Sequence, residues 1–103
     1  MNILQKKHTL INNIENYLNG KCSLNILREF SWDIIEYFSK TKKEKLPEYQ
    51  EFEKEFWYVI WQIQHIADEF HENDNVTKKI LIESLDYLKK TKHIPEKYIG
   101  TRP

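Results

Sequence analysis

The sequence predicts an all-α, single-domain four-helix bundle over residues 1–103, closed by an ordered, non-helical C-terminal tail. Apolar residues recur at spacings of three and four along most of the chain, which is the period of an amphipathic helix. Only two glycines and three prolines are present, so long elements joined by short loops are expected. The aromatic content of 14% is high and argues against disorder, despite 31% charged residues. Strict heptads are not sustained, which favours a globular bundle over a coiled coil.

The first two helices are expected over residues 2–19 and 24–40. Gly20 suits the end of the first helix, because a left-handed backbone costs glycine little. Ser23 is placed to cap the start of the second helix. The residues expected to face inward are Leu4, His8, Ile11, Ile14 and Leu18 in the first helix and Leu24, Leu27, Phe30, Ile34 and Phe38 in the second.

The third helix is expected over residues 47–72, with Pro47 in its first turn. At 100° per residue it has one broad apolar arc and an opposite arc that mixes indoles with carboxylates. The apolar arc contains Tyr49, Phe52, Phe56, Val59, Ile60, Ile63, Ile66, Ala67 and Phe70. The opposite arc contains Glu51, Trp57, Tyr58, Trp61, His65, Asp68, Glu69 and Glu72.

The fourth helix is expected over residues 76–90, after a capping segment at 73–75. Its inward residues are Thr77, Leu81, Leu85 and Leu88. Pro95 stops any helix in the tail, residues 93–103. Because Ile94, Tyr98 and Ile99 are too apolar for a free end, this tail is expected to fold back over the bundle.

Composition indicates the cellular compartment in which the chain works. The single cysteine, Cys22, excludes an internal disulfide and fits a reducing compartment. The first residues contain no apolar run that could form a secretory signal. The longest apolar run, 56–61, is far shorter than the roughly 20 residues that cross a bilayer. A cytoplasmic protein with no membrane partner is expected.

Catalytic and metal-binding patterns are weak. Asp68 and His71 have the spacing of a carboxylate–histidine metal motif, but no other helix supplies a second one. All-α nucleotide pyrophosphohydrolases have a similar size, yet the adjacent pair of glutamates that they use for Mg²⁺ is missing between Glu51 and Glu55. We therefore predict no catalytic residue, no metal ligand and no cofactor. The late lysines are interrupted by Glu83 and Asp86, so direct nucleic-acid binding is not expected either.

Charge is unevenly distributed although the net charge is zero. Residues 44–75 contain nine acids against two lysines, whereas the segments before and after carry an excess of bases. This pattern has two interpretations: neighbouring helices neutralise each other, or an acidic face meets a basic partner. Trp57 and Trp61 likewise either pack under another element, joined by Trp32 in a second aromatic cluster, or stand exposed as docking residues. The candidate partner-binding residues are Glu51, Glu55, Tyr58, Trp61, His65, Asp68, Glu69 and Glu72.

The run from Phe56 to His65, followed by Asp68 and Glu69 and closed by residues 98–103, is similar to small all-helical immunity proteins of bacterial toxin systems. These proteins accompany toxins of the colicin and contact-dependent growth-inhibition types. The resemblance implies a cytoplasmic, non-enzymatic protein that binds one cognate toxin domain, often a nuclease, and blocks its active site. The alternatives are a helical adaptor or regulatory module, including a homodimer, and thirdly a metal-dependent all-α nucleotide phosphohydrolase.

Overall fold

The described residues form four α-helices and one short 3-10 helix. The computed structural model describes residues 2–69, 74–90, 93–95 and 102–103, with the side chains of 67–69 excepted. The helices are α1 (Ile3–Leu18), α2 (Leu24–Lys40), η1 (Lys43–Lys45), α3 (Glu53–Glu69) and α4 (Asn75–Leu88). The predicted all-α fold is confirmed, and the described ranges contain no strand.

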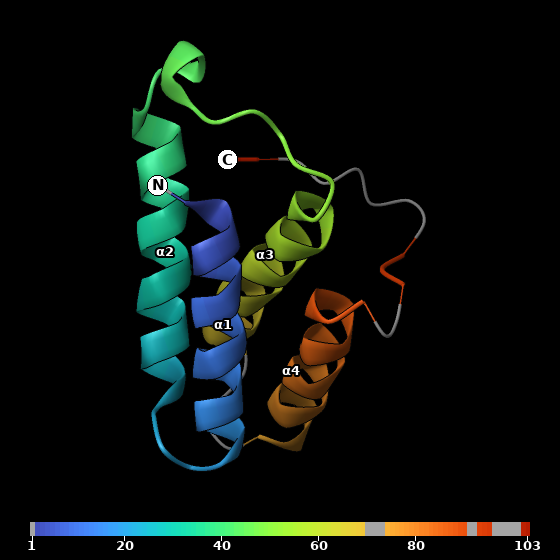
Figure 1. The fold of residues 1–103 in the computed structure, drawn as a ribbon. Coiled ribbons are helices and arrows are strands. Elements are labelled where there is room, and N and C mark those ends of the chain that lie inside the picture. Colours follow the sequence, from blue (N-terminus) through green and yellow to red (C-terminus); the bar gives the residue numbers. More distant parts are fainter. Residues whose placement is uncertain (1, 70–73, 91–92, 96–101) are drawn as a thin grey trace.

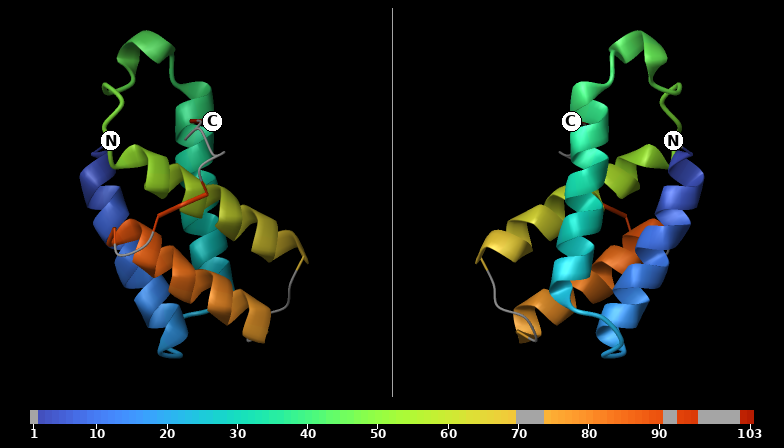
Figure 2. Two further views of the ribbon diagram at one scale, coloured as in Figure 1. Left: turned by 90° about the vertical axis from the view of Figure 1, so that its right-hand side faces the viewer. Right: turned by 90° about the vertical axis from the view of Figure 1, so that its left-hand side faces the viewer.

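The helices close into a ring of four neighbours. Helix α1 packs against α2 and α4, and α3 packs against the same two helices from the other side. In Figure 1, α1 passes in front of the lower end of α3, and Figure 2 shows α3 and α4 crossing α2 obliquely. The fully buried apolar side chains come from all four helices and include Leu10, Ile14, Leu27, Phe56, Trp57, Ile60, Ile63, Ile66 and Leu81.

Local sequence explains most helix ends. The Asn2 side chain accepts the Gln5 N–H at 3.1 Å at the start of α1. The Asp74 side chain accepts the Val76 N–H at 2.7 Å at the start of α4. Each contact satisfies a backbone donor that the first helical turn leaves without a partner. Gly20 follows α1 with a φ of +73°, as its predicted capping role requires.

Gly20→Ala is expected to destabilise the protein by about 1 kcal/mol, because an added Cβ disfavours the left-handed backbone. No atom lies within 4 Å of the position of that Cβ, so the cost is conformational and not steric. The matched change is Lys90→Gly, at a non-glycine residue with a φ of 59° after α4, which should be neutral or stabilising. Urea unfolding of both variants tests this pair, and equal losses of stability would contradict it.

The third helix begins later than predicted. It starts at Glu53, not at Pro47, and residues 46–52 contain no helix. Gln50 and Glu53 bond reciprocally: the Glu53 N–H donates to the Gln50 carbonyl at 3.0 Å, and the Gln50 N–H donates to Glu53 Oε2 at 2.6 Å. This second contact resembles the carboxylate half of a capping box and fixes the helix start there. The predicted end at residue 72 lies outside the described residues.

Some inward positions also differ from the prediction. Leu4 and His8 are exposed on α1, where Ile3, Leu10 and Tyr17 are buried instead. Phe30 on α2 and Leu85 on α4 are half-buried, while their neighbours Ser31 and Ser84 are buried. Tyr49 is 44% exposed, because it precedes α3 and does not belong to its apolar arc. The bundle thus buries an arc on each helix that is rotated slightly from the expected one.

A buried ion pair joins the C-terminus to α3. Glu53 is completely buried, and its two carboxylate oxygens accept hydrogen bonds from Arg102 Nε and Nη2 at 2.8 Å each. The guanidinium carbon lies 5.3 Å from the ring centroids of both Phe38 and Tyr49, so the ion pair also joins α2 to the segment before α3. Ile94, at the other end of the tail, is buried. Residues 96–101 between them lie outside the described residues, and an ordered strap there stays a prediction.

Candidate protein-interaction surface

Trp57 and Trp61 lie one turn apart on α3 but in opposite environments. Trp57 is completely buried, and its Nε1 donates to Glu53 Oε1 at 3.1 Å. Its ring packs edge-to-face with Phe38 and Phe56, with centroids 4.8 and 5.0 Å away. Placing Trp57 on the outer arc is therefore wrong, and the alternative that it packs under another element is confirmed, because Phe38 belongs to α2. Trp61 is 38% exposed and stays on the surface.

The centre of the outer face of α3 is aromatic. Tyr58, Trp61 and His65 line a shallow hollow of about 310 Å³ together with Gln62. The Tyr58 ring meets Tyr87 of α4 edge-on, with centroids 5.3 Å apart. Burial, followed by the nearby Tyr58, raises the pKa of Tyr87, so its phenol stays protonated through the neutral range. This pair borders the aromatic centre on its α4 side.

The predicted acidic residues are less uniform than the sequence indicates. Glu51 is exposed just before α3. Glu55 is half-buried, and its Oε2 is buried without a hydrogen bond from the described residues. The side chains of Asp68 and Glu69, and all of Glu72, lie outside the described part of the structure. Glu53 was not among the predicted residues, and its charge is paired with Arg102 inside the core.

A second exposed indole lies on α2. Trp32 is 54% exposed, so the predicted aromatic cluster of Trp32 with Trp57 and Trp61 is wrong. It borders a hollow of about 490 Å³. That hollow is lined by Asn25, Arg28, Glu29, Trp32, Asp33 and Gln64. The sequence carried this signal, because Glu29, Trp32, Asp33 and Glu36 recur at helical spacing on one face.

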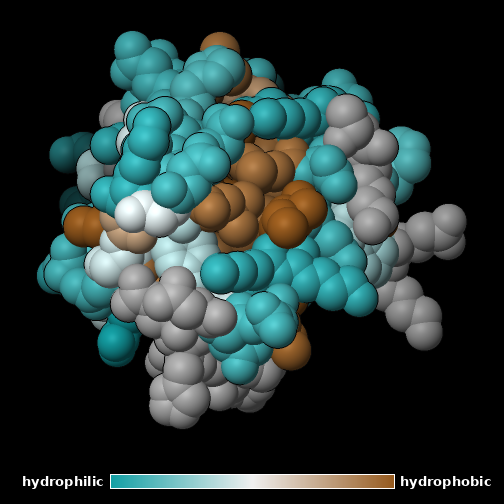
Figure 3. All heavy atoms as spheres, turned by 90° about the horizontal axis from the view of Figure 1, so that it is seen from below, coloured by the Kyte–Doolittle hydropathy of each residue, from teal (hydrophilic) through white to brown (hydrophobic). Residues whose placement is uncertain are grey.

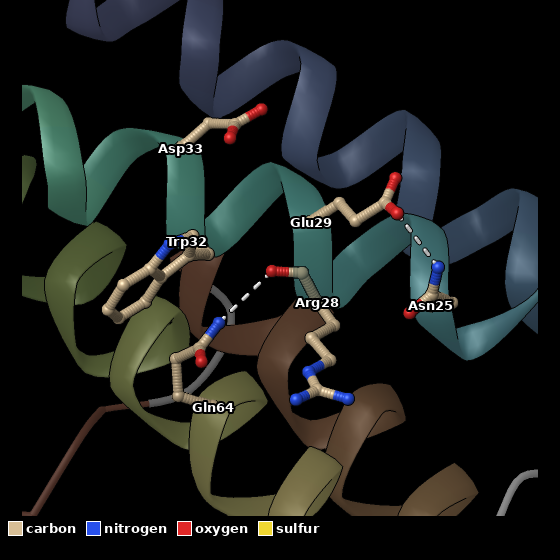
Figure 4. A pocket seen from close by; sticks show the side chains of 6 residues that line it. All are labelled: Asn25, Arg28, Glu29, Trp32, Asp33 and Gln64. Carbon is tan, nitrogen blue, oxygen red and sulfur yellow. Dashed lines mark hydrogen bonds between the residues drawn. The ribbon is translucent and has the colours of Figure 1, made fainter.

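Gln64 connects the two exposed faces. Its Nε2 crosses from α3 to donate to the Arg28 carbonyl of α2 at 3.1 Å, as Figure 4 shows. Gln64 lies three residues after Trp61, so the hollow on α2 adjoins the aromatic centre of α3. In the same view the carboxylates of Glu29 and Asp33 point away from the Arg28 guanidinium, which extends toward α4. The outer faces of α2 and α3 thus form one continuous surface, here called the α2–α3 surface.

A neighbouring lysine stabilises the ionised form of one carboxylate of α2, that of Glu36. The pKa of Glu36 is lowered, first by a hydrogen bond from Lys40 Nζ at 2.6 Å and by the charge of that lysine. A smaller contribution comes from the indole N–H of Trp32. Glu29 and Asp33 are exposed, and Glu29 Oε1 also accepts the Asn25 amide at 3.0 Å. Glu29, Asp33 and Glu36 therefore lie within about one helical turn of Trp32 along α2.

The end of the bundle where α2 and α4 begin has a different character. Figure 3 views this end and shows an area of apolar side chains among hydrophilic ones. Ile26 and Val76, in the first turns of α2 and α4, are both exposed there at more than two-fifths of their surface. An apolar area of this kind is the feature that a self-associating module would use.

Other kinds of site find little support among the described residues. Within them, no three His, Cys, Asp or Glu side chains gather closely enough to hold a metal ion. No described helix has the length and hydrophobicity needed to cross a membrane. Cys22 is half-buried, and its thiol donates to the Asn13 carbonyl at 3.6 Å, which makes it a packing residue between α1 and α2.

Fold and surface together describe a small helical bundle with an aromatic and partly acidic face. Comparisons of the chain with protein-family models, curated proteins and solved structures gave no match.

Proposed function

We propose that this chain is an immunity protein that binds and neutralises a cognate bacterial toxin domain, a basic nuclease domain, through the α2–α3 surface. The observation that carries the proposal is the exposure of two indoles, Trp32 and Trp61, beside carboxylates on a bundle that has otherwise buried its large aromatic residue Trp57. Exposed tryptophans are favoured as the residues that supply most of the binding energy of interfaces.

The charges fit an inhibitor of a nuclease. Glu29, Asp33 and Glu51 are exposed acids on or beside the surface, and a nuclease needs basic residues to hold phosphates. Complementary charge speeds association and selects the partner, while the indoles slow dissociation. The protein would then act by covering the toxin's active site, without chemistry of its own.

Capture of the toxin is the direct test. The protein should form a one-to-one complex when it is co-expressed with the product of the gene immediately upstream, and that complex should suppress a nuclease activity of the product. Recovery of the protein alone, with undiminished toxicity, would overturn the proposal. If sedimentation shows a concentration-dependent dimer and no toxin binds, the adaptor alternative is favoured. The apolar area with Ile26 and Val76 would then be the expected dimer interface.

Trp61→Ala should weaken toxin binding about tenfold or more, mainly through faster dissociation. The matched control is Ile82→Ala, which also truncates an exposed apolar side chain but on the flank of α4 away from Tyr87.

Reversal of two acids, Glu51→Lys with Glu69→Lys, should slow association and flatten its salt dependence. Biosensor kinetics at several salt concentrations measure both effects, and an unchanged affinity in the double reversal would remove these acids from the interface.

A further inference from the structure

We infer that Arg102 is a positioning residue for the α2–α3 surface: it fixes how α3 lies against α2, and so sets the relative placement of the exposed indoles of Trp32 and Trp61. It acts from the C-terminal segment and lines neither of the two hollows of that surface. Its role in partner binding rests on the proposed function, whereas its effect on the shape of the surface does not.

Arg102 contacts α2 and the start of α3 at the same time. Its Nε and Nη2 donate to the two carboxylate oxygens of Glu53, the first residue of α3, at 2.8 Å each. Its guanidinium carbon lies 5.3 Å from the ring centroid of Phe38, a buried residue near the end of α2. In Figure 1 the C-terminus accordingly lies between the last turns of α2 and the first turn of α3. A planar guanidinium that is paired along one edge and packed on its face cannot move without losing one of these contacts.

Glu53 transmits this position into α3. Its Oε2 accepts the backbone N–H of Gln50 at 2.6 Å, which fixes where the helix begins. Its Oε1 accepts the indole N–H of Trp57 at 3.1 Å, and the Trp57 ring packs edge-to-face on Phe38 with centroids 4.8 Å apart. Phe38, Glu53, Trp57 and Arg102 therefore form a closed set of contacts between α2 and α3, here called the buried joint.

A second polar contact joins the same two helices farther along. Gln64 Nε2 of α3 donates to the Arg28 carbonyl of α2 at 3.1 Å. This hydrogen bond is exposed, so water competes for both groups and the bond holds the helices only weakly. Apolar packing between the helices adds stability but is non-directional. The register of α3 against α2 therefore depends most on the buried joint, where Glu53 and Trp57 have no exposed surface.

Both exposed indoles lie between these two contacts. Trp32 lies on α2 between Arg28 and Phe38. Trp61 lies on α3 between the buried joint and Gln64. Because Trp32 and Gln64 line the same hollow, shown in Figure 4, a shift of α3 changes the surface around Trp32 as well as the position of Trp61. A partner that contacts both indoles would bind only the chains in which they are correctly placed, so loss of the joint lowers the apparent affinity by that fraction.

The shape of the surface can be tested without a partner. In ¹H–¹⁵N spectra of the folded Arg102→Met chain, the indole signals of Trp32 and Trp61 should both shift, although neither residue belongs to the buried joint. The matched control is Leu10→Ala, which removes a completely buried side chain from α1, a helix that contributes no residue to the joint. It should destabilise the fold and leave both signals in place. Unmoved signals in Arg102→Met, or equal shifts in Leu10→Ala, would overturn the inference.

Arg102→Lys provides the conservative variant, which keeps the charge if Arg102→Met does not fold. A lysine ammonium can pair with Glu53 but cannot also lie flat on Phe38, because it is a compact point charge. The signals of Trp32 and Trp61 should therefore shift in the same direction as in Arg102→Met, by a smaller amount. Shifts confined to the indole of Trp57 would show a local role only and would contradict the positioning role.

Binding of the product of the upstream gene separates this inference from the proposed function. At a temperature at which both variants are folded, Arg102→Met should weaken binding about tenfold, while Leu10→Ala leaves it unchanged. Full affinity in Arg102→Met, or an equal loss in Leu10→Ala, keeps the proposed function and overturns the positioning role. Shifts of the Trp32 and Trp61 signals in a chain that captures no toxin keep the positioning role and overturn the proposed function.

Discussion

Arg102→Met is expected to lower the free energy of unfolding by about 3–5 kcal/mol, because it leaves the carboxylate of Glu53 buried without its counter-charge. Glu53 has no exposed surface, and Arg102 is 18% exposed at its side chain, so water cannot replace the guanidinium without opening the bundle. A domain of this size has about 5–15 kcal/mol of stability in total, so the loss would be a large part of it. Urea unfolding followed by circular dichroism measures it.

Two further variants identify the buried charge as the cause. Glu53→Gln combined with Arg102→Met should be more stable than Arg102→Met alone, because a neutral amide can still accept from Trp57 Nε1. Lys40→Met removes a cation from a surface pair with Glu36, and its unfolding curve should overlay that of the parent protein. A double variant no more stable than Arg102→Met would show that the lost packing of the arginine, and not the stranded charge, sets the cost.

This ion pair also shows where prediction from sequence ended. Glu53 and Arg102 are 49 residues apart, and nothing local indicates which glutamate between residues 51 and 55 is the buried one. Helical period predicted the number of helices and the bounds of α2, because those depend on neighbouring residues. The start of α3 was wrong for the same reason that Glu53 was missed: its carboxylate both caps the helix and receives the tail.

The surface was predictable in part. Trp57 follows Phe56 by one residue, about 100° around the helix, which placed it outside the expected apolar arc although it is buried. Trp61 and His65 lie on the side of the helix opposite the apolar arc, as predicted, and both are exposed. The acidic face of α2 could have been recognised from its helical spacing. This face was not proposed, because Trp32 was expected to pack against the other tryptophans and not to be exposed.

Alanine substitution of each of the two tryptophans of α3 should give very different losses of stability, because one tryptophan lies in the core and the other on the surface. Trp57→Ala removes a fully buried indole, its edge-to-face contacts with Phe38 and Phe56 and its hydrogen bond to Glu53, and should cost about 3–5 kcal/mol of stability. Trp61→Ala makes the same change four residues later on an exposed site and should cost less than about 1 kcal/mol. Circular dichroism during urea unfolding compares the two without relying on tryptophan fluorescence.

The comparison also links the fold to the proposed function. A Trp61→Ala protein that unfolds like the parent but releases the toxin faster would show that this indole is retained for binding and not for packing. Equal destabilisation of the two variants would mean that Trp61 is a core residue and that α3 faces the bundle differently. In that case the α2 face, with Trp32 and its carboxylates, would be the remaining surface on which a partner could be sought.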